Sequence, residues 1–253
     1  MMDRSFLSDP DVVAASRDFV CIRLATYESA SEAKILASVA VTRSGLLENT
    51  VFALLAPDGK TPLARGGRSP HEAFPGPPNE AVRRLATGMA GFAKKYPGTS
   101  APGEALPYLA DLRRGMNVAA CDLQPLVGVV ARTPEARKKI EQALLPAAWS
   151  KDFVGRYAFA AAKDPAEAAE YVDGKIGPEG VFVVQPDAFG TKGRLLAFAA
   201  GSDEAAITAA LAQGLKSFSA EPKDSRKHID EGVRRGLSWK TEIPVTDPQV
   251  PRK

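Results

Sequence analysis

The sequence predicts an α/β protein made of two related units. Apolar runs of strand length alternate with amphipathic helical patterns, which is the order expected of α/β folds. Residues 51–68 (VFALLAPDGKTPLARGGR) predict a strand, a Pro-Asp-Gly turn and a returning strand. Residues 181–201 (VFVVQPDAFGTKGRLLAFAAG) show the same features about 130 residues later: they begin with Val-Phe, contain a Pro-Asp turn and have an arginine in the returning strand. A repeat at this distance indicates two related units.

The composition is that of a globular chain with nearly balanced charge. Of 253 residues, 45% are apolar and 25% charged, and 33 basic against 30 acidic residues give a net charge of +3. This length accommodates two domains with a core in each. The sequence shows no clustered basic face and no apolar run of bilayer length, so neither a nucleic-acid nor a membrane partner is expected. Residues 1–7 contain no secretory signal, and a cytoplasmic location is the default expectation.

The first unit begins with a predicted helix, because Ser8, Asp9 and Pro10 suit a helix start. Residues 19–25 (FVCIRLA) predict a short strand with alternate apolar residues on one face. A second helix is expected to open at Ser31.

After the first hairpin, a Pro-rich loop leads to a predicted helix between Asn79 and Tyr96. Its apolar residues recur at helical spacing and predict one core-facing stripe: Val82, Leu85, Ala86, Met89, Phe92 and Ala93.

The second unit has a more regular alternation. Its continuous apolar run at residues 126–131 (LVGVVA) is typical of a strand covered on both faces. Thr133, followed by Pro and Glu, predicts the start of the next helix. The remaining predicted elements are a strand at residues 157–162, a helix at residues 165–176, the second hairpin and a helix capped by Ser202.

These elements divide the chain into four parts. We expect a first domain at residues 1–97, a Pro- and Gly-rich linker at residues 98–107, a second domain at residues 108–220 and a polar tail at residues 221–253.

The predicted element order resembles the thioredoxin fold. Residues 2–24 (MDRSFLSDPDVVAASRDFVCIRL) and 51–67 (VFALLAPDGKTPLARGG) are similar to the thioredoxin-like family whose members carry Cys-x-x-Cys-Lys, Phe-x-Asp-x-x-Val, Asn-x-Phe-Val and Phe-Leu-Asp-Pro-Asp-Gly-Lys. The fold class that this resemblance implies is α/β, with two tandem thioredoxin-like domains (β-α-β-α-β-β-α), the first lacking its first strand.

The resemblance also implies thiol–disulfide chemistry at the end of the first strand, where a helix N-terminus lowers the thiol pKa. In this chain that motif would fall just before Met1, so we expect Met1 not to be the natural start, with a Cys or selenocysteine motif upstream. The competing interpretation is that residues 237–243, or residues 117–121, supply the missing strand.

Few residues are candidates for a site. No Cys-x-x-Cys is present, so no catalytic residue is assigned; Cys21 and Cys121 are weak candidates, each more typical of a buried structural thiol. The resemblance places Asn49 and Thr50 where the family has its substrate-binding cis-proline. The few histidines and cysteines form no metal-ligand spacing, and no cofactor is expected.

Two hypotheses for the function follow. In the first, the chain is a thioredoxin-family protein related to thiol–disulfide oxidoreductases. It has no Cys-x-x-Cys and is therefore expected to be redox-inactive as given, and its partner is a protein with a thiol or disulfide. In the second, it is a non-catalytic thioredoxin-fold module that binds or supports a protein partner. The sequence does not indicate the client or the oligomeric state.

Overall fold

The computed structural model describes residues 6–7, 9–22, 24, 26–39, 51–97, 105–220, 223–238 and 241–243 of the chain. The chain forms two compact units. The N-terminal unit comprises Met1–Ser100 with Trp239–Lys253, and the sheet unit comprises Ala101–Ser238.

The sheet unit is built on a mixed sheet with the strand order β2-β1-β4-β5-β3. β1 is parallel to β2 and antiparallel to β4, while β5 is antiparallel to β4 and parallel to β3. The strands are β1 (Leu126–Val130), β2 (Ala158–Ala161), β3 (Val172–Asp173), β4 (Gly180–Pro186) and β5 (Gly193–Ala200). The mixed α/β class predicted for this part of the chain is therefore confirmed.

Four helices accompany the sheet: α5 (Leu112–Asp122), α6 (Pro134–Ala148), α7 (Pro165–Tyr171) and α8 (Glu204–Ser217). Each begins after a side chain that accepts a hydrogen bond from a backbone N–H of the first turn: Asp111, Thr133, Asp164 and Asp203. The cap predicted at Thr133 is confirmed. The cap predicted at Ser202 is wrong by one residue, because the Asp203 carboxylate takes that place.

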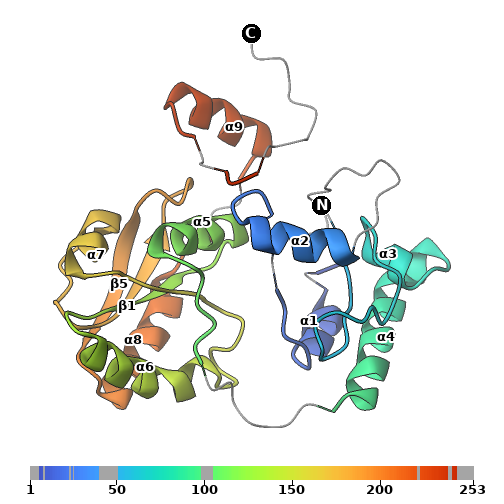
Figure 1. Cartoon of the computed structure of the whole chain (residues 1–253), viewed down its shortest axis with the longest axis horizontal. Helices are drawn as coiled ribbons and strands as arrows, with labels where there is room; N and C mark the ends of the chain where they lie inside the picture. The colour runs from blue at the N-terminus through green and yellow to red at the C-terminus, as the bar shows by residue number, and fades with distance from the viewer. Residues whose placement is uncertain are drawn as a thin grey trace. The chain divides into compact units, whose positions relative to one another are not determined.

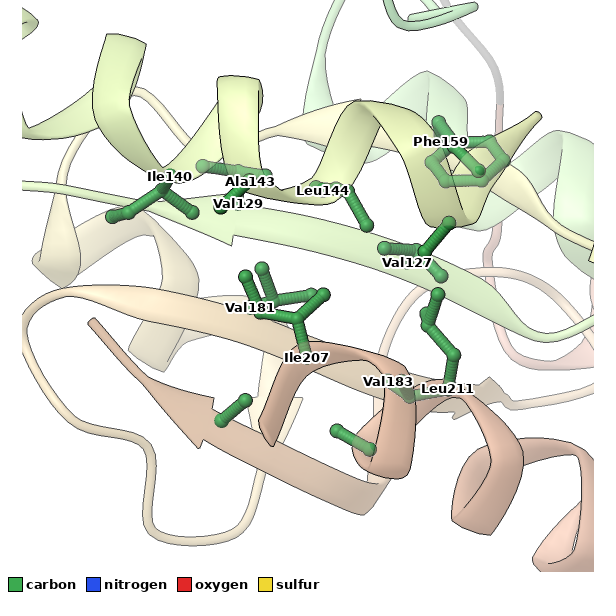
Figure 2. Packing of buried hydrophobic residues seen from close by; sticks show 14 of the residues in the cluster. Val127, Val129, Ile140, Ala143, Leu144, Phe159, Val181, Val183, Ile207 and Leu211 are labelled. Atoms are coloured by element: carbon green, nitrogen blue, oxygen red, sulfur yellow. The ribbon is translucent and has the colours of Figure 1, made fainter. Parts of the chain in front are cut away.

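The helices cover both faces of the sheet, with α6 and α8 on one face and α5 and α7 on the other (Figure 1). Figure 2 shows the first face, where side chains of α6 and α8 meet the alternate valines of β1 and β4. The labelled residues are Val127, Val129, Ile140, Ala143, Leu144, Phe159, Val181, Val183, Ile207 and Leu211. β1 is buried along its whole length, as its continuous apolar run predicts.

On the other face, Phe182 crosses over Gly128. The two residues are directly paired in the antiparallel register of β1 and β4. A Cβ atom at Gly128 would lie 1.9 Å from Cζ of Phe182, so only glycine leaves room for the ring.

The N-terminal unit contains α1 (Pro10–Ser16), α2 (Ala30–Val39), α3 (Pro70–Ala73), the 3-10 turn η2 (Pro78–Glu80) and α4 (Ala81–Lys95). Its core is small: Val12 of α1 and Leu54 pack with Leu85 and Met89 of α4. The stripe predicted on α4 therefore faces the core.

Residues 52–67 run antiparallel, but they pair through single bridges instead of a continuous ladder. The bridges join Phe52 to Gly67 and Leu55 to Pro62. At the turn, Asp58 accepts hydrogen bonds from the backbone N–H groups of Lys60 and Thr61 (both 2.8 Å) and from the Thr61 hydroxyl (2.5 Å).

The β4–β5 turn of the sheet unit uses contacts of the same kind over a turn that is one residue longer. Asp187 accepts from the N–H of Phe189 (3.0 Å), the N–H of Thr191 (2.9 Å) and the Thr191 hydroxyl (2.5 Å). Gly190 and Gly59 adopt left-handed φ values of 64° and 66° in the two turns. The repeat seen in the sequence therefore corresponds to a shared turn chemistry.

The strand predicted at residues 19–25 is wrong. The described residues of this segment form no strand, and Val20 and Ile22 are 82% and 75% exposed. An apolar alternation forms a strand only where a neighbouring strand completes its hydrogen bonds and buries one face, and no described residue does so here.

Neither segment considered for the missing strand forms one in its described residues. Residues 117–121 lie within α5, and the described part of residues 237–243 contains no strand. The segment expected as a polar tail includes a helix, α9 (Ser225–Arg234). Among the described helices, none combines the length and apolarity needed to span a bilayer.

Candidate functional site: the outer edge of strand β2

The two cysteines are exposed free thiols, so the prediction that they are buried is wrong. Cys21 follows α1, and its Sγ lies 3.8 Å from the carbonyl oxygen of Ser16. The residue is exposed as a whole, but nearby protein atoms desolvate its sulfur, which raises the pKa of the thiol; the weak hydrogen bond to Ser16 offsets only part of this effect. A raised pKa makes Cys21 a weaker nucleophile at neutral pH.

Cys121 lies in the last turn of α5, shortly before β1 begins at Leu126. Its backbone is helical because the apolar residues of this stretch, such as Met116 and Ala119, recur at helical spacing and pack under the sheet. Asn49 and Thr50 lie outside the described residues.

The junction between β1 and α6 is the place where the resemblance puts a redox motif in the sheet unit. The chain there is Ala131-Arg132-Thr133-Pro134. The Thr133 hydroxyl accepts the Ala136 N–H at 3.1 Å and so serves as a helix cap. This junction offers no thiol, and the described part of the chain holds no group of side chains suited to a metal ion.

The sheet unit has one open edge beside a cavity. β2 is an end strand of the sheet, and its outer side pairs with residues before α5 through a single bridge, Tyr108 to Phe159. The N–H of Leu109 donates to the Phe159 carbonyl at 2.8 Å. No further bridge on this side occurs among the described residues, although β2 continues to Ala161.

The strand period shows which backbone groups face this opening. The N–H groups of Ala158 and Ala162 donate toward β1, to Pro125 and Val129, whereas Phe159 faces outward. Because backbone orientation alternates along a strand, the N–H and C=O of Ala161 also face outward.

A cavity of about 500 Å³ lies at this point, which we call the β2 cleft. It is lined by Tyr108, Leu109, Asp111, Arg137, Ala161, Lys163 and Glu167, together with Ala110. The cleft therefore lies where the parallel strands β1 and β2 end, a common position for binding sites in α/β folds.

The polar groups of the cleft are held in place by the backbone. Arg137 donates to the carbonyl oxygens of Ala162 and Lys163, the second at 3.0 Å, which secures the chain after β2. The Glu167 carboxylate accepts the backbone N–H of Lys163, and Asp111 accepts the N–H of Arg114 at 2.7 Å. Both carboxylates are thus engaged, while the exposed Lys163 side chain extends a cationic group at the rim.

The Tyr108 hydroxyl is buried and makes no hydrogen bond of normal geometry with the described residues. Its burial, and next the Glu141 carboxylate near it, raise the pKa of the phenol above its ordinary value. Tyr108 is therefore a neutral hydrogen-bond donor at physiological pH. The arrangement can bind polar backbone groups, but it contains no nucleophile paired with a base.

A second hollow, of about 670 Å³, lies beside α4 in the N-terminal unit. Its main polar group, Arg84, donates to the carbonyl oxygens of Phe74 and Pro77 and pairs with Glu80. This arginine fixes the loop before α4, so the β2 cleft is the stronger candidate.

Sequence reasoning did not single out Tyr108, Arg137 or Lys163. The position of Lys163 directly after a predicted strand is a signal that could have found it, since polar residues at the carboxyl ends of parallel strands often line sites. Comparisons with protein-family models, curated proteins and solved structures find no match.

Proposed function

We propose that the sheet unit is a thioredoxin-like domain without dithiol chemistry, and that it binds a protein partner through the β2 cleft. The strand order β2-β1-β4-β5, with one parallel and two antiparallel pairs, supports the thioredoxin-like assignment. The placement of α6 and α8 on one face and α7 on the other supports it as well.

The proposal that the N-terminal unit is related to this fold is based on its turn at residues 58–61. Asp58 bonds to Thr61 as Asp187 bonds to Thr191 in the sheet unit, with one residue fewer between the two side chains, and this similarity supports a common origin for the two hairpins. A tandem arrangement of two thioredoxin-like domains is proposed on this basis.

The observation that carries the binding function is the open backbone at Ala161. An extended segment of a partner can accept its N–H and donate to its C=O, continuing the pairing that Leu109 begins. The exposed Lys163 ammonium group then contacts the side chains or carbonyl oxygens of that segment.

Photo-crosslinking in cells of the source organism tests this function. A photoreactive phenylalanine analogue is placed at Lys163 in one variant and at Val154, a partly exposed residue after α6, in a control variant. We expect a recurring adduct with one protein segment at position 163 and none at position 154.

A synthetic peptide of that segment then provides the quantitative step. Ala161→Pro removes the outward N–H while the pairing with β1 through the neighbouring residues is kept, and we expect it to weaken peptide binding about tenfold. Equal binding by Ala161→Pro, or adducts of the same kind at both positions, contradicts the proposal.

Thiol–disulfide exchange is a second candidate, because Cys21 and Cys121 are both accessible. Reduction of insulin disulfides in the presence of dithiothreitol distinguishes the two functions. We expect the chain to add nothing to the rate with dithiothreitol alone. An accelerated rate that disappears in Cys21→Ala or Cys121→Ala establishes redox activity instead.

A further inference from the structure

Helix α2 of the N-terminal unit is capped by a residue from the far end of the chain. The backbone N–H of Ala30, the first residue of α2, donates to Oε2 of Glu242 at 2.8 Å. The two residues are 212 positions apart in the sequence, and both belong to the N-terminal unit. The first N–H groups of a helix have no partner within it, and the side chain that binds them usually comes from the residue directly before the helix.

The backbone of Glu242 is attached at the same place. Its N–H donates to the carbonyl oxygen of Tyr27 at 2.8 Å, and the N–H of Ile243 donates to the same oxygen at 3.3 Å. Tyr27 lies three residues before α2, so one short segment offers both an acceptor and a donor to residues 242–243. We call residues 241–243 the C-terminal strap.

The chain next to α2 provides a weaker cap. The Ser29 hydroxyl accepts the Glu32 N–H at 3.4 Å, longer than the usual range for such a bond, and it also lies 3.0 Å from the Ser31 hydroxyl. A carboxylate is a stronger acceptor than a hydroxyl and is favoured at the positive end of a helix dipole. Among the described residues, Glu242 is therefore the main cap of α2.

The packing of α2 makes this attachment important. Ala33 and Leu36 of α2 are buried, but no described residue of the helix belongs to the apolar cluster formed around α1 and α4. A helix of ten residues has little stability of its own and depends on its tertiary contacts. We therefore expect α2 to respond to loss of the strap more strongly than α4.

The strap follows the last helix of the sheet unit, α9. The His228 imidazole of α9 stacks on the Phe189 ring of the β4–β5 turn, with a centroid separation of 4.3 Å. The chain thus leaves the N-terminal unit after α4, forms the sheet unit and then returns to the start of α2.

We propose that the C-terminal strap is a latch on α2, which stays docked while Glu242 caps it and detaches when the strap is withdrawn. Detachment uncovers the side of the helix that carries Ala33 and Leu36, which are three residues apart and share one face. Cleavage of the chain between α9 and the strap is expected to open the latch. The strap and α2 both belong to the N-terminal unit, so the latch does not depend on the binding function proposed for the β2 cleft of the sheet unit.

Hydrogen exchange of the full chain, measured by mass spectrometry, tests the latch. In Glu242→Ala we expect the amides of α2 to exchange at least about fivefold faster than in the wild type, as for loss of a typical helix cap, while α4 stays protected as an internal reference. Glu242→Gln keeps an acceptor oxygen without the charge and should give a smaller increase. Asp230→Ala removes an exposed carboxylate of α9 and is the matched control, in which α2 should be unchanged.

Cleavage tests the latch without a substitution at Glu242. A recognition sequence for a specific protease is inserted after Ser238, the folded full chain is cut, and the released segment is removed by gel filtration. We expect α2 then to exchange at least as fast as in Glu242→Ala, with α4 still protected. Wild-type protection of α2 in Glu242→Ala, or protection that persists after the cut segment has left, overturns the latch. An equal loss of protection in α2 and α4 overturns it as well, because α2 would then not detach separately.

Discussion

The hydroxyl of Thr191 donates a 2.5 Å hydrogen bond to Oδ2 of Asp187 and so holds the turn on which α9 rests. The N-terminal unit repeats this pair, since Thr61 donates to Oδ2 of Asp58 over the same distance. A tight turn of this kind depends on a short acidic side chain that bonds to its own backbone.

Asp187→Ala removes three hydrogen bonds from a partly buried turn. We expect it to lower the free energy of unfolding of the sheet unit by about 1–3 kcal/mol, because the freed donors lose their acceptor. Urea denaturation measures the change. Asp152→Ala, at an exposed position after α6, is the matched control, and an equal effect of the two substitutions would show that the turn contacts contribute nothing.

The Asp58 carboxylate is fully exposed, but the Thr61 hydroxyl, the Thr61 N–H and the Lys60 N–H lower its pKa to about 2. A lowered folded-state pKa means that the bonds stabilise the folded chain above about pH 4, the ordinary value for Asp, and that this contribution is lost as the pH falls through 2. NMR titration of Asp58 measures the midpoint directly. In Thr61→Ala we expect the midpoint to move up toward about 4; an unchanged midpoint would exclude the hydroxyl as the main cause.

Gly128→Ala places a methyl group where Phe182 Cζ lies 1.9 Å away. We expect a loss of about 3 kcal/mol or more, because neither the central strand nor the buried ring can move aside. Combining it with Phe182→Leu should recover part of the loss. A double-mutant cycle from denaturation curves should give a coupling energy of about 1–3 kcal/mol, whereas additive effects would argue against this contact.

Both thiols should react with Ellman's reagent in the native protein, because Cys21 and Cys121 are exposed. Since desolvation raises the Cys21 pKa, Cys21 should react more slowly than an unperturbed thiol at neutral pH. The reaction should therefore show a faster and a slower phase. The variants Cys21→Ala and Cys121→Ala show which thiol gives rise to each phase. A thiol that reacts only after addition of denaturant would contradict its exposed position.

Several elements of the sheet unit could be predicted from local patterns, but α5 and the short strand β3 were not predicted. The apolar run of β1 and the Thr133 cap of α6 each act within a few residues, so sequence alone located them. The alternation at Val20 and Ile22 is equally strand-like, yet these residues are exposed and form no strand. A strand needs a partner from elsewhere in the chain, and a local pattern carries no information on whether one is present.

The β2 cleft could be predicted only in part. The position of Lys163 directly after a strand was visible in the sequence. The sequence did not show that the segment before α5 pairs with β2 through only one described bridge, Tyr108 to Phe159. The open backbone of Ala161 follows from this short pairing.

The sequence by itself determined the strands β1, β2, β4 and β5, the Thr133 start of α6 and the positions of the two Pro-Asp turns, because capping, periodicity and turn bonding join residues within one or two turns of chain. Only the tertiary structure decided which strand edge stays open, that both cysteines face outward, and that His228 stacks on Phe189. These outcomes depend on which distant segments meet, and the energy of such contacts is set by packing and burial in the folded chain.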